Sequence, residues 1–185
     1  MITALIINTL VLVFCLVSII VFVVHIAQEM TSNAPFIPIS KDVLAEIIRA
    51  FDLKEGSVVY ELGSGDGRVV FAIAENFPTV RVVGVERSFL PFVLSSIARR
   101  ARNIKNVEFI HANFFDVSVV PATHVFLYLF PSVTNTLLPK FEKELNLGAR
   151  VISCDFKFKD KEPVAVIDLH RKQYSLGSKI YVYQF

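Results

Sequence analysis

The chain has 185 residues, which is enough for one well-buried domain and one further element. Hydrophobic residues make up 54% of it, and the formal net charge is only +2. This balance lacks the basic excess of nucleic-acid-binding domains, so we expect no nucleic-acid partner. The cysteines, Cys15 and Cys154, show neither metal-ligand spacing nor a pattern that predicts a disulfide, and no metal site is expected.

No charged side chain occurs between Met1 and Val24, and the segment from Ile2 to Ile26 predicts a transmembrane helix. About 20 apolar helical residues cross a hydrocarbon core roughly 30 Å thick. A secretory signal peptide is the competing interpretation, but it would have a basic start and an apolar core of about 7 to 15 residues. The sequence lacks both features, which favours a membrane anchor over residues 1–28.

The orientation of this anchor follows from the basic residues. All of them follow the predicted helix, beginning with Lys41 and Arg49. Because positive charge favours the cytoplasmic side, a single-pass protein with its N-terminus outside and its domain in the cytoplasm is expected.

An extended linker is predicted over residues 29–39, because Pro35 and Pro38 cannot lie inside a helix. Ser40 then has the character of an N-cap for a helix that runs to about Phe51. We expect the folded domain to occupy residues 40–185.

Apolar runs and helical stretches alternate through this domain. Buried strands are predicted at 57–62, 80–85, 107–110, 123–130 and 149–154, and helices at 68–77, 89–103 and 133–145. The last two apolar runs, 164–169 and 178–185, have no helix between them and predict an antiparallel hairpin. The expected fold is therefore α/β, a Rossmann-like doubly wound sheet that is mostly parallel, preceded by one transmembrane helix.

A glycine-rich loop lies between the first strand and its helix, in the segment 61–68 that reads ELGSGDGR. Three glycines allow a sharp turn and close approach of the backbone to a ligand. The acidic residues Glu61 and Asp66 would repel the pyrophosphate of a dinucleotide but suit a cation. S-adenosylmethionine carries a sulfonium and an ammonium and no phosphate, so this loop predicts S-adenosylmethionine as the cofactor.

The second and third strands add further cofactor candidates. Glu86 ends the second strand about 20 residues beyond the glycine loop, where an acidic residue meets ribose hydroxyls. After the third strand, Asn113 is expected to bond the adenine edge and Phe114 to pack on its face, although a capping Asn and a core Phe are alternatives. The predicted cofactor-binding residues are Glu61, Gly63, Ser64, Gly65, Asp66, Gly67, Glu86, Asn113 and Phe114.

Together these segments resemble class I, seven-β-strand methyltransferases. The segments PFIP at 35–38, GSGDGR at 63–68 and VFLYLFP at 125–131, with KEL at 143–145 leading to GARV at 148–151, resemble one family in particular. It comprises the membrane-anchored protein-lysine methyltransferases whose eukaryotic members act in mitochondria, on the adenine nucleotide translocase and the ATP synthase c subunit. The resemblance implies methylation of a lysine in a membrane or membrane-proximal protein, at a mitochondrial membrane if the source is eukaryotic. A lipid or small-molecule methyltransferase and a non-catalytic cofactor-binding module are the alternatives.

Tyr128, Phe130 and Pro131 follow the fourth strand, where this fold presents the methyl group, and are the predicted catalytic residues. Tyr128 is expected to orient the amine and Phe130 to wall its channel, unless both are core aromatics. Asp155 ends the fifth strand. It is a candidate for binding an ammonium, and the alternative is that it is simply a solvated residue at the strand end.

A basic cluster lies at the end of the helix before the third strand and comprises Arg99, Arg100, Arg102 and Lys105. A solvated helix end is the simpler interpretation, and contact with anionic lipid headgroups is the other.

Overall fold

A computed structural model describes residues 2–31, 39, 41–169 and 177–185. The chain divides into two compact units, Met1–Pro35 and Phe36–Phe185. Most of the predicted linker and the predicted N-cap, Ser40, lie outside the described residues.

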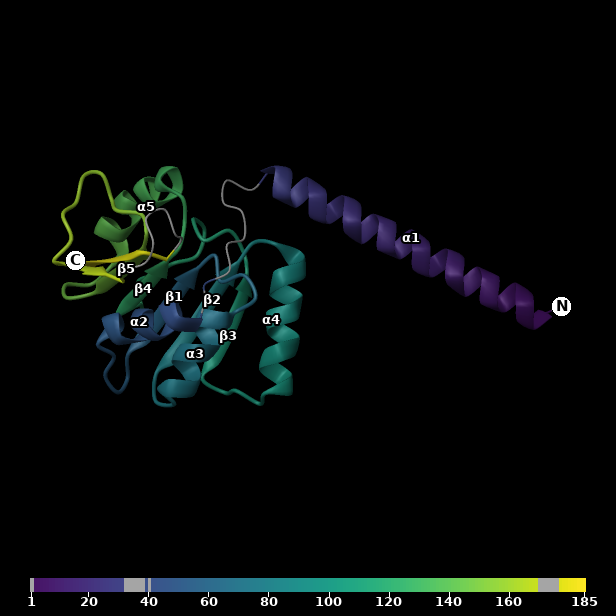
Figure 1. Cartoon of the computed structure of the whole chain (residues 1–185), viewed down its shortest axis with the longest axis horizontal. Helices are drawn as coiled ribbons and strands as arrows, with labels where there is room; N and C mark the ends of the chain where they lie inside the picture. Colours follow the sequence, from purple (N-terminus) through teal and green to yellow (C-terminus); the bar gives the residue numbers. More distant parts are fainter. Residues whose placement is uncertain (1, 32–38, 40, 170–176) are drawn as a thin grey trace. The chain divides into compact units, whose positions relative to one another are not determined.

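The first unit is the helix α1, Ile2–Thr31, drawn in purple in Figure 1. Its stretch Ile2–Val23 has a mean hydropathy of 3.0 and no buried residue, so it is long and apolar enough to cross a membrane. A signal sequence near the N-terminus would pass this same test of length and hydropathy. The helix continues through Glu29–Thr31, where the sequence predicted the start of an extended linker, because the first helix-breaking residue is Pro35.

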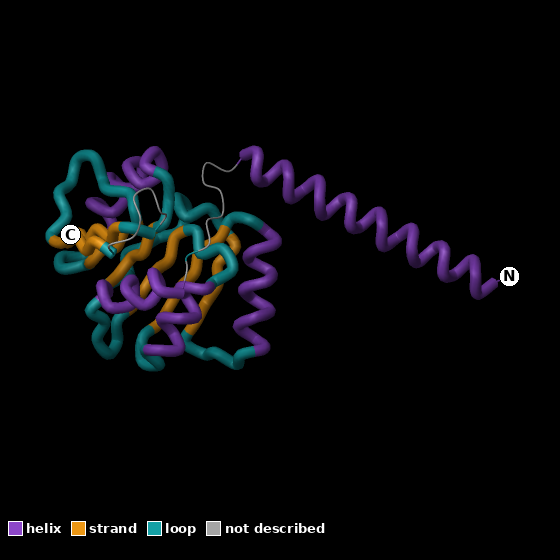
Figure 2. The backbone as a smooth tube through the Cα atoms, in the orientation of Figure 1, coloured by secondary structure: helices purple, strands orange, loops and turns teal. Residues whose placement is uncertain are grey.

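The second unit is built on a seven-stranded sheet with the order β3-β2-β1-β4-β5-β7-β6 (Figure 1, Figure 2). The first five strands are parallel, and β7 pairs antiparallel with both β5 and β6. The strands are β1 Val58–Leu62, β2 Arg81–Glu86, β3 Val107–His111, β4 His124–Leu127, β5 Arg150–Cys154, β6 Ala165–Asp168 and β7 Lys179–Gln184. The doubly wound sheet and its C-terminal hairpin are thus confirmed.

Four helices of the described residues cover the sheet: α2 Lys41–Phe51, α3 Arg68–Asn76, α4 Phe89–Ala101 and α5 Pro131–Glu144. The buried residues of α2 and α3 form one apolar core with Val59, Val82 and Phe126 of the sheet. The helices α3 and α4 both connect strands in the direction of β3, whereas α5 connects β4 to β5 in the opposite direction. Because such crossovers are right-handed, α3 and α4 lie on one face of the sheet and α5 lies on the other. Figure 1 shows α2 and α3 in front of the strands.

The fourth strand is shorter than the run 123–130 predicted for it. Strand β4 ends at Leu127, and α5 begins at Pro131, two residues before the predicted helix start. The partner strand β5 ends at Cys154, and Asp155 leaves the sheet with a left-handed φ of 61°. Because Pro131 occupies a helix N-terminus, residues 128–130 form a connection between strand and helix rather than strand.

Candidate active site

The carboxyl ends of β1, β2, β3 and β4 meet at one edge of the sheet, where open α/β sheets bind ligands. The amides of Gly63 and Ser64 both donate to the Val85 carbonyl, which ties the loop after β1 to the end of β2. Ala112 N–H donates to the Glu86 carbonyl, so the segment after β3 follows β2. On the other side, a Cβ added to Gly63 would lie 3.1 Å from Leu129 Cδ2. The predicted cofactor and methyl-acceptor segments are therefore neighbours.

The glycine loop turns through three left-handed residues: φ is 82° at Gly63, 54° at Gly65 and 79° at Gly67. L-residues with a side chain rarely adopt these angles. Gly67 has a second constraint, because an added Cβ would lie 2.6 Å from Cζ of Phe109. The loop ends where Gly67 caps α3, and it presents its backbone at the helix N-terminus.

Glu86 holds this loop. Its buried carboxylate accepts from Gly65 N–H at 2.8 Å through Oε2 and from Ser88 N–H at 2.6 Å through Oε1. The carboxylate therefore fixes the middle of the glycine turn and the start of α4 together. Each of its oxygens has a further lone pair available for a ribose hydroxyl.

Glu61, in contrast, is buried at the end of β1 beneath the loop. Burial raises the pKa of its carboxyl well above the usual value, although Val70 N–H donates to its Oε2 at 3.2 Å. The charges of Asp66 and Glu86 raise this pKa further, and that of Arg68 opposes them. A buried carboxylate of this kind gains stability when a cation binds beside it.

We expect Glu61→Gln to weaken S-adenosylmethionine binding about tenfold, or about 1.4 kcal/mol, without loss of stability. The folded-state pKa of Glu61 is raised, so its stability contribution is present at low pH and is lost as pH rises through that pKa. The neutral amide avoids this cost and still accepts from Val70. Calorimetric titration across pH should show affinity rising with pH in the parent and less so in the variant. The matched control is Glu108→Gln, at an exposed position. If the affinity of Glu61→Gln rose with pH as steeply as that of the parent, this role of Glu61 would be contradicted.

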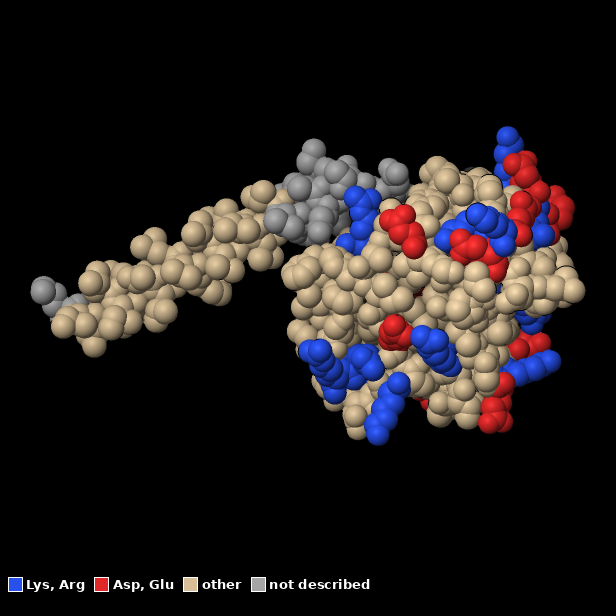
Figure 3. All heavy atoms as spheres, turned by 180° about the vertical axis from the view of Figure 1, so that it is seen from behind, with Lys and Arg blue, Asp and Glu red and all other residues tan. Residues whose placement is uncertain are grey.

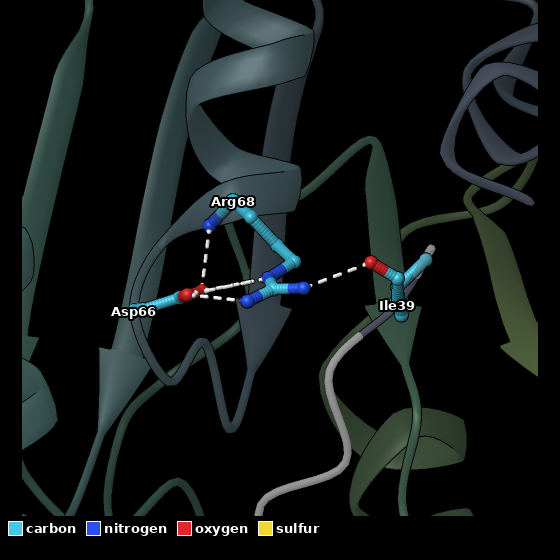
Figure 4. A network of polar contacts seen from close by, with 3 residues as sticks. All are labelled: Ile39, Asp66 and Arg68. Carbon is cyan, nitrogen blue, oxygen red and sulfur yellow. Dashed lines mark hydrogen bonds and ion pairs between the residues drawn. The ribbon is translucent and has the colours of Figure 1, made fainter. Parts of the chain in front are cut away.

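The Asp66 carboxylate, predicted to face the cofactor, is engaged by Arg68 (Figure 4). Arg68 Nη2 lies 2.7 Å from Asp66 Oδ2, and Nη1 donates to the Ile39 carbonyl at 2.9 Å. Burial acts to raise the pKa of Asp66, but the hydrogen bonds and charge of Arg68 outweigh it and leave the pKa below its ordinary value. Arg68 thus neutralises a loop carboxylate, and it also joins the loop to Ile39, two residues before α2. A direct contact of Asp66 with the cofactor stays a prediction.

Ser64 is buried in the same loop, and its Oγ forms no hydrogen bond within the described part of the chain. An unpaired buried hydroxyl costs free energy unless a ligand satisfies it. Two buried carboxylates, a glycine turn and this hydroxyl fit a nucleoside that carries positive charge. They do not fit a pyrophosphate, which the carboxylates would repel.

The third strand ends in His111, for which the sequence predicted no role, and leads to the predicted residues Asn113 and Phe114. His111 pairs in register with Glu86, donates to the Arg87 carbonyl through Nε2–H, and stacks on Phe92 of α4 with ring centroids 4.9 Å apart. Asn113 closes a turn, since its Oδ1 accepts from Phe115 N–H, and its contact with adenine stays a prediction. Phe114 is half-buried beside Phe115. The period-2 register of adjacent strands could have placed His111 beside Glu86.

At the end of β4, the Tyr128 hydroxyl donates to Asp155 Oδ2 at 3.0 Å. Burial, and then the charge of Asp155, raises the pKa of Tyr128 far above its usual value, so the hydroxyl stays protonated. Asp155 is not a free strand end, because its carboxylate also accepts from the amides of Gly177, Ser178 and Lys179. It anchors the start of β7 and holds the Tyr128 ring.

The Phe156 ring lies beside this tyrosine and also packs against Phe130. Phe156 lies 6.3 Å from Tyr128 and 5.8 Å from Phe130, measured between ring centroids. Phe130 precedes α5, and Pro131 is exposed at its first turn. Phe156 was missed by the sequence analysis because a phenylalanine after β5 carries no signal of its own. The group offers a neutral hydroxyl near two apolar rings, and the neighbouring residue Leu129 lies against the glycine loop.

Comparison with known proteins shows the family to which the chain belongs. The model of the ANTKMT methyltransferase domain matches residues 61–165, more than half of the chain. The chain belongs to this family. Its fold and its glycine loop are those of a methyltransferase, and S-adenosylmethionine is its cofactor.

Similar proteins include a protein-lysine N-methyltransferase of Saccharolobus islandicus, 29% identical over 82% of this chain and 93% of that protein. The mouse lysine N-methyltransferase of the ATP synthase c subunit is 33% identical over 67% of this chain and 49% of its own length. The mouse adenine nucleotide translocase lysine N-methyltransferase is 31% identical over 73% and 58%. The chain thus spans nearly all of the Saccharolobus relative and about half of each mouse relative.

Among solved structures, an RNA methyltransferase from Salinibacter ruber in complex with S-adenosyl-L-homocysteine is 32% identical, with a TM-score of 0.72. The match covers 80% of this chain and 93% of that one. A methyltransferase from Geobacter sulfurreducens bound to the same product is 18% identical, with a TM-score of 0.58, and shows the fold alone. Several members of this fold thus hold the demethylated cofactor.

Proposed function

We propose that this ANTKMT-family chain methylates the side-chain amine of a lysine in a membrane or membrane-proximal protein. The observation that carries the proposal is the neutral Tyr128 hydroxyl, which is held by Asp155 beside the Phe156 ring, one residue before Leu129 at the glycine loop. The lysine specificity of the Saccharolobus and mouse relatives supports it. The helix α1 serves as a single-pass anchor, with the catalytic unit on the cytoplasmic side.

The residues of the site divide the work. Glu86 and the glycine loop hold the cofactor, Glu61 and Ser64 meet its polar groups, and Asn113 and Phe114 cover its base. When bound, S-adenosylmethionine supplies a methyl group on a sulfonium, which is a good leaving group. The chain then has to position an amine in line with that methyl, and such positioning is worth several kcal/mol, up to about 7–11 for ideal geometry.

The lysine must reach the site as the neutral amine, although its solution pKa is about 10.4. The apolar rings of Phe130 and Phe156 disfavour the ammonium and so lower the pKa of an entering lysine. Tyr128 donates to Asp155 and retains lone pairs that accept an N–H of the amine, which aims the nitrogen lone pair at the methyl. Once the amine held by Tyr128 had taken the methyl group, it would be a methylated ammonium, and it would then lose a proton to water.

Tyr128→Phe should lower kcat about tenfold, because it removes one aligning hydrogen bond worth about 1 kcal/mol or more, and should leave cofactor affinity unchanged. Single-turnover methylation and calorimetric titration with S-adenosyl-L-homocysteine separate the two effects. The control is Tyr181→Phe, a half-buried tyrosine on β7. Full activity in Tyr128→Phe would show that the Tyr128 hydroxyl has no role in the reaction.

The direct test is to incubate the full chain with methyl-labelled S-adenosylmethionine and membranes, and then to separate protein, lipid and RNA. Label in protein, recovered as methyllysine after hydrolysis, is the expected result. Label confined to the lipid extract would instead support the lipid-methylating alternative and overturn the lysine proposal.

RNA is the second candidate acceptor, because the Salinibacter structure is described as an RNA methyltransferase. The small net charge of +2 argues against it, since binding to a phosphate backbone depends on clustered basic side chains. RNA that takes up label, with protein remaining unlabelled, would favour this candidate over lysine.

A further inference from the structure

Helix α4 exposes an apolar stripe to solvent. Four large apolar side chains of this single helix, Phe89, Leu90, Leu94 and Ile97, are between 38% and 57% exposed. The last three recur at i, i+4 and i+7, so they lie on one face of the helix. The other face packs on β2 and β3, where Ser95 is fully buried. Other exposed large apolar residues of the catalytic unit are spread over different elements: Phe115, Val120, Leu147, Val164 and Val166.

Basic side chains continue this stripe at the C-terminal end of α4. Arg100 is exposed and lies one helical turn beyond Ile97, and Lys105 is exposed in the loop that follows. Arg102 is held differently, because it pairs with Glu75 and covers the ring of Phe71. Figure 3 shows Lys and Arg side chains gathered at one edge of this unit, with uncharged surface above them.

We infer that this face of α4 lies on the lipid bilayer and prefers an anionic surface. Apolar side chains followed by basic ones are the pattern of an interfacial helix, whose apolar residues enter the headgroup boundary while Lys and Arg contact anionic lipids. The inference rests on the proposed membrane anchoring by α1. Once α1 is inserted, the short connection from Thr31 to Ile39 keeps the catalytic unit near the bilayer, because a chain extends at most about 3.6 Å per residue.

This contact has a consequence for the reaction. The stripe begins at Phe89, directly after Glu86 and Ser88, whose hydrogen bond fixes the start of α4. A bilayer-bound α4 therefore restrains the cofactor edge of the sheet at the membrane surface. The substrates that it favours are lysines at the membrane–water boundary rather than in soluble segments.

The test uses the full chain in a Cys15→Ser background, with Leu94→Cys carrying an environment-sensitive fluorophore; Cys154 is fully buried. The protein is reconstituted into vesicles of phosphatidylcholine alone or mixed with phosphatidylserine. Leu147→Cys, at a fully exposed loop position, is the matched labelling control. We expect a blue shift and quenching by spin-labelled lipid at position 94, stronger with phosphatidylserine and reduced in high salt, and neither effect at position 147.

Flotation of the same vesicles separates two ways of failing. Protein that does not float shows that α1 is no anchor, and the inference falls with it. Protein that floats while position 94 behaves like position 147 leaves the anchor intact and overturns the inference alone. A shift that grows with the protein-to-lipid ratio would indicate contact between copies of the chain and would also overturn it.

Charge variants test the lipid preference. Exchanging Arg100 and Lys105 for Gln should shift the equilibrium toward the undocked state by roughly fivefold per charge in phosphatidylserine vesicles. The control pair is Lys157→Gln with Lys159→Gln, which removes the same charge from exposed positions after β5. Equal effects of the two pairs would show a response to net charge only and would contradict a specific α4 contact.

Discussion

Replacing Glu86 by alanine should raise the Kd for S-adenosyl-L-homocysteine about a hundredfold, or about 3 kcal/mol. The carboxylate is buried and accepts from the amides of Gly65 and Ser88, so its removal leaves two donors unpaired in the unliganded protein. It also removes the group proposed to accept the ribose hydroxyls. Hydrogen bonds to charged groups contribute about 1.5 to 3 kcal/mol each, which makes this the most damaging single change to cofactor binding.

Calorimetric titration of the full chain in detergent measures the Glu86→Ala effect. Glu108→Ala is the control, because that glutamate lies on the neighbouring strand in an exposed pair with Arg81, and such pairs contribute little. The parent and the control should bind alike. If Glu86→Ala bound with parental affinity, the glycine loop would not be the cofactor site.

Gly67→Ala should lower the free energy of unfolding of the catalytic unit by about 3 kcal/mol. The left-handed φ of 79° costs an alanine about 1 to 2 kcal/mol. The added Cβ would also lie 2.6 Å from Phe109 Cζ, and overpacking of this kind costs about 1 to 3 kcal/mol. Because Phe109 also packs edge-on against Phe71, the ring has little room to move.

Gly56→Ala separates the two costs. Gly56 has nearly the same φ, 78°, but an added Cβ there meets no atom within 4 Å. Denaturant unfolding should therefore show a loss of only about 1 kcal/mol for Gly56→Ala. Equal losses in both variants would mean that the loop packs less tightly on Phe109 than the structure indicates.

The order and type of the elements could be predicted from the sequence because hydrophobic runs and helical periodicity alternate clearly after residue 40. The C-terminal end of the fourth strand could not be predicted in this way. The run 123–130 is apolar almost throughout, so hydrophobicity alone gives no reason for a strand to stop at Leu127. The end is set by the left-handed turn at Asp155 in the neighbouring strand and by Pro131 in the following helix.

The candidate site likewise contains residues that could be predicted and contacts that could not. Glu86 and the glycines were predictable because their spacing follows from the fold, and the structure places them together. The bond between Tyr128 and Asp155 was not, since it joins the ends of two strands that no local pattern connects. The raised pKa of Glu61 and the unpaired hydroxyl of Ser64 depend on burial, which only the folded chain reveals.

The central claim is methyl transfer to a lysine of a membrane or membrane-proximal protein, with the cofactor held by the loop that Glu86 fixes. The most direct measurement is peptide mass spectrometry of membranes incubated with the full chain and S-adenosylmethionine whose methyl group is deuterated. The account predicts deuterated methyl groups on lysine Nζ of one or a few membrane-associated proteins, and far fewer with the Glu86→Ala variant at a cofactor concentration near the parental Kd. Deuterium found only in lipid or RNA, or equally with both chains, would contradict it.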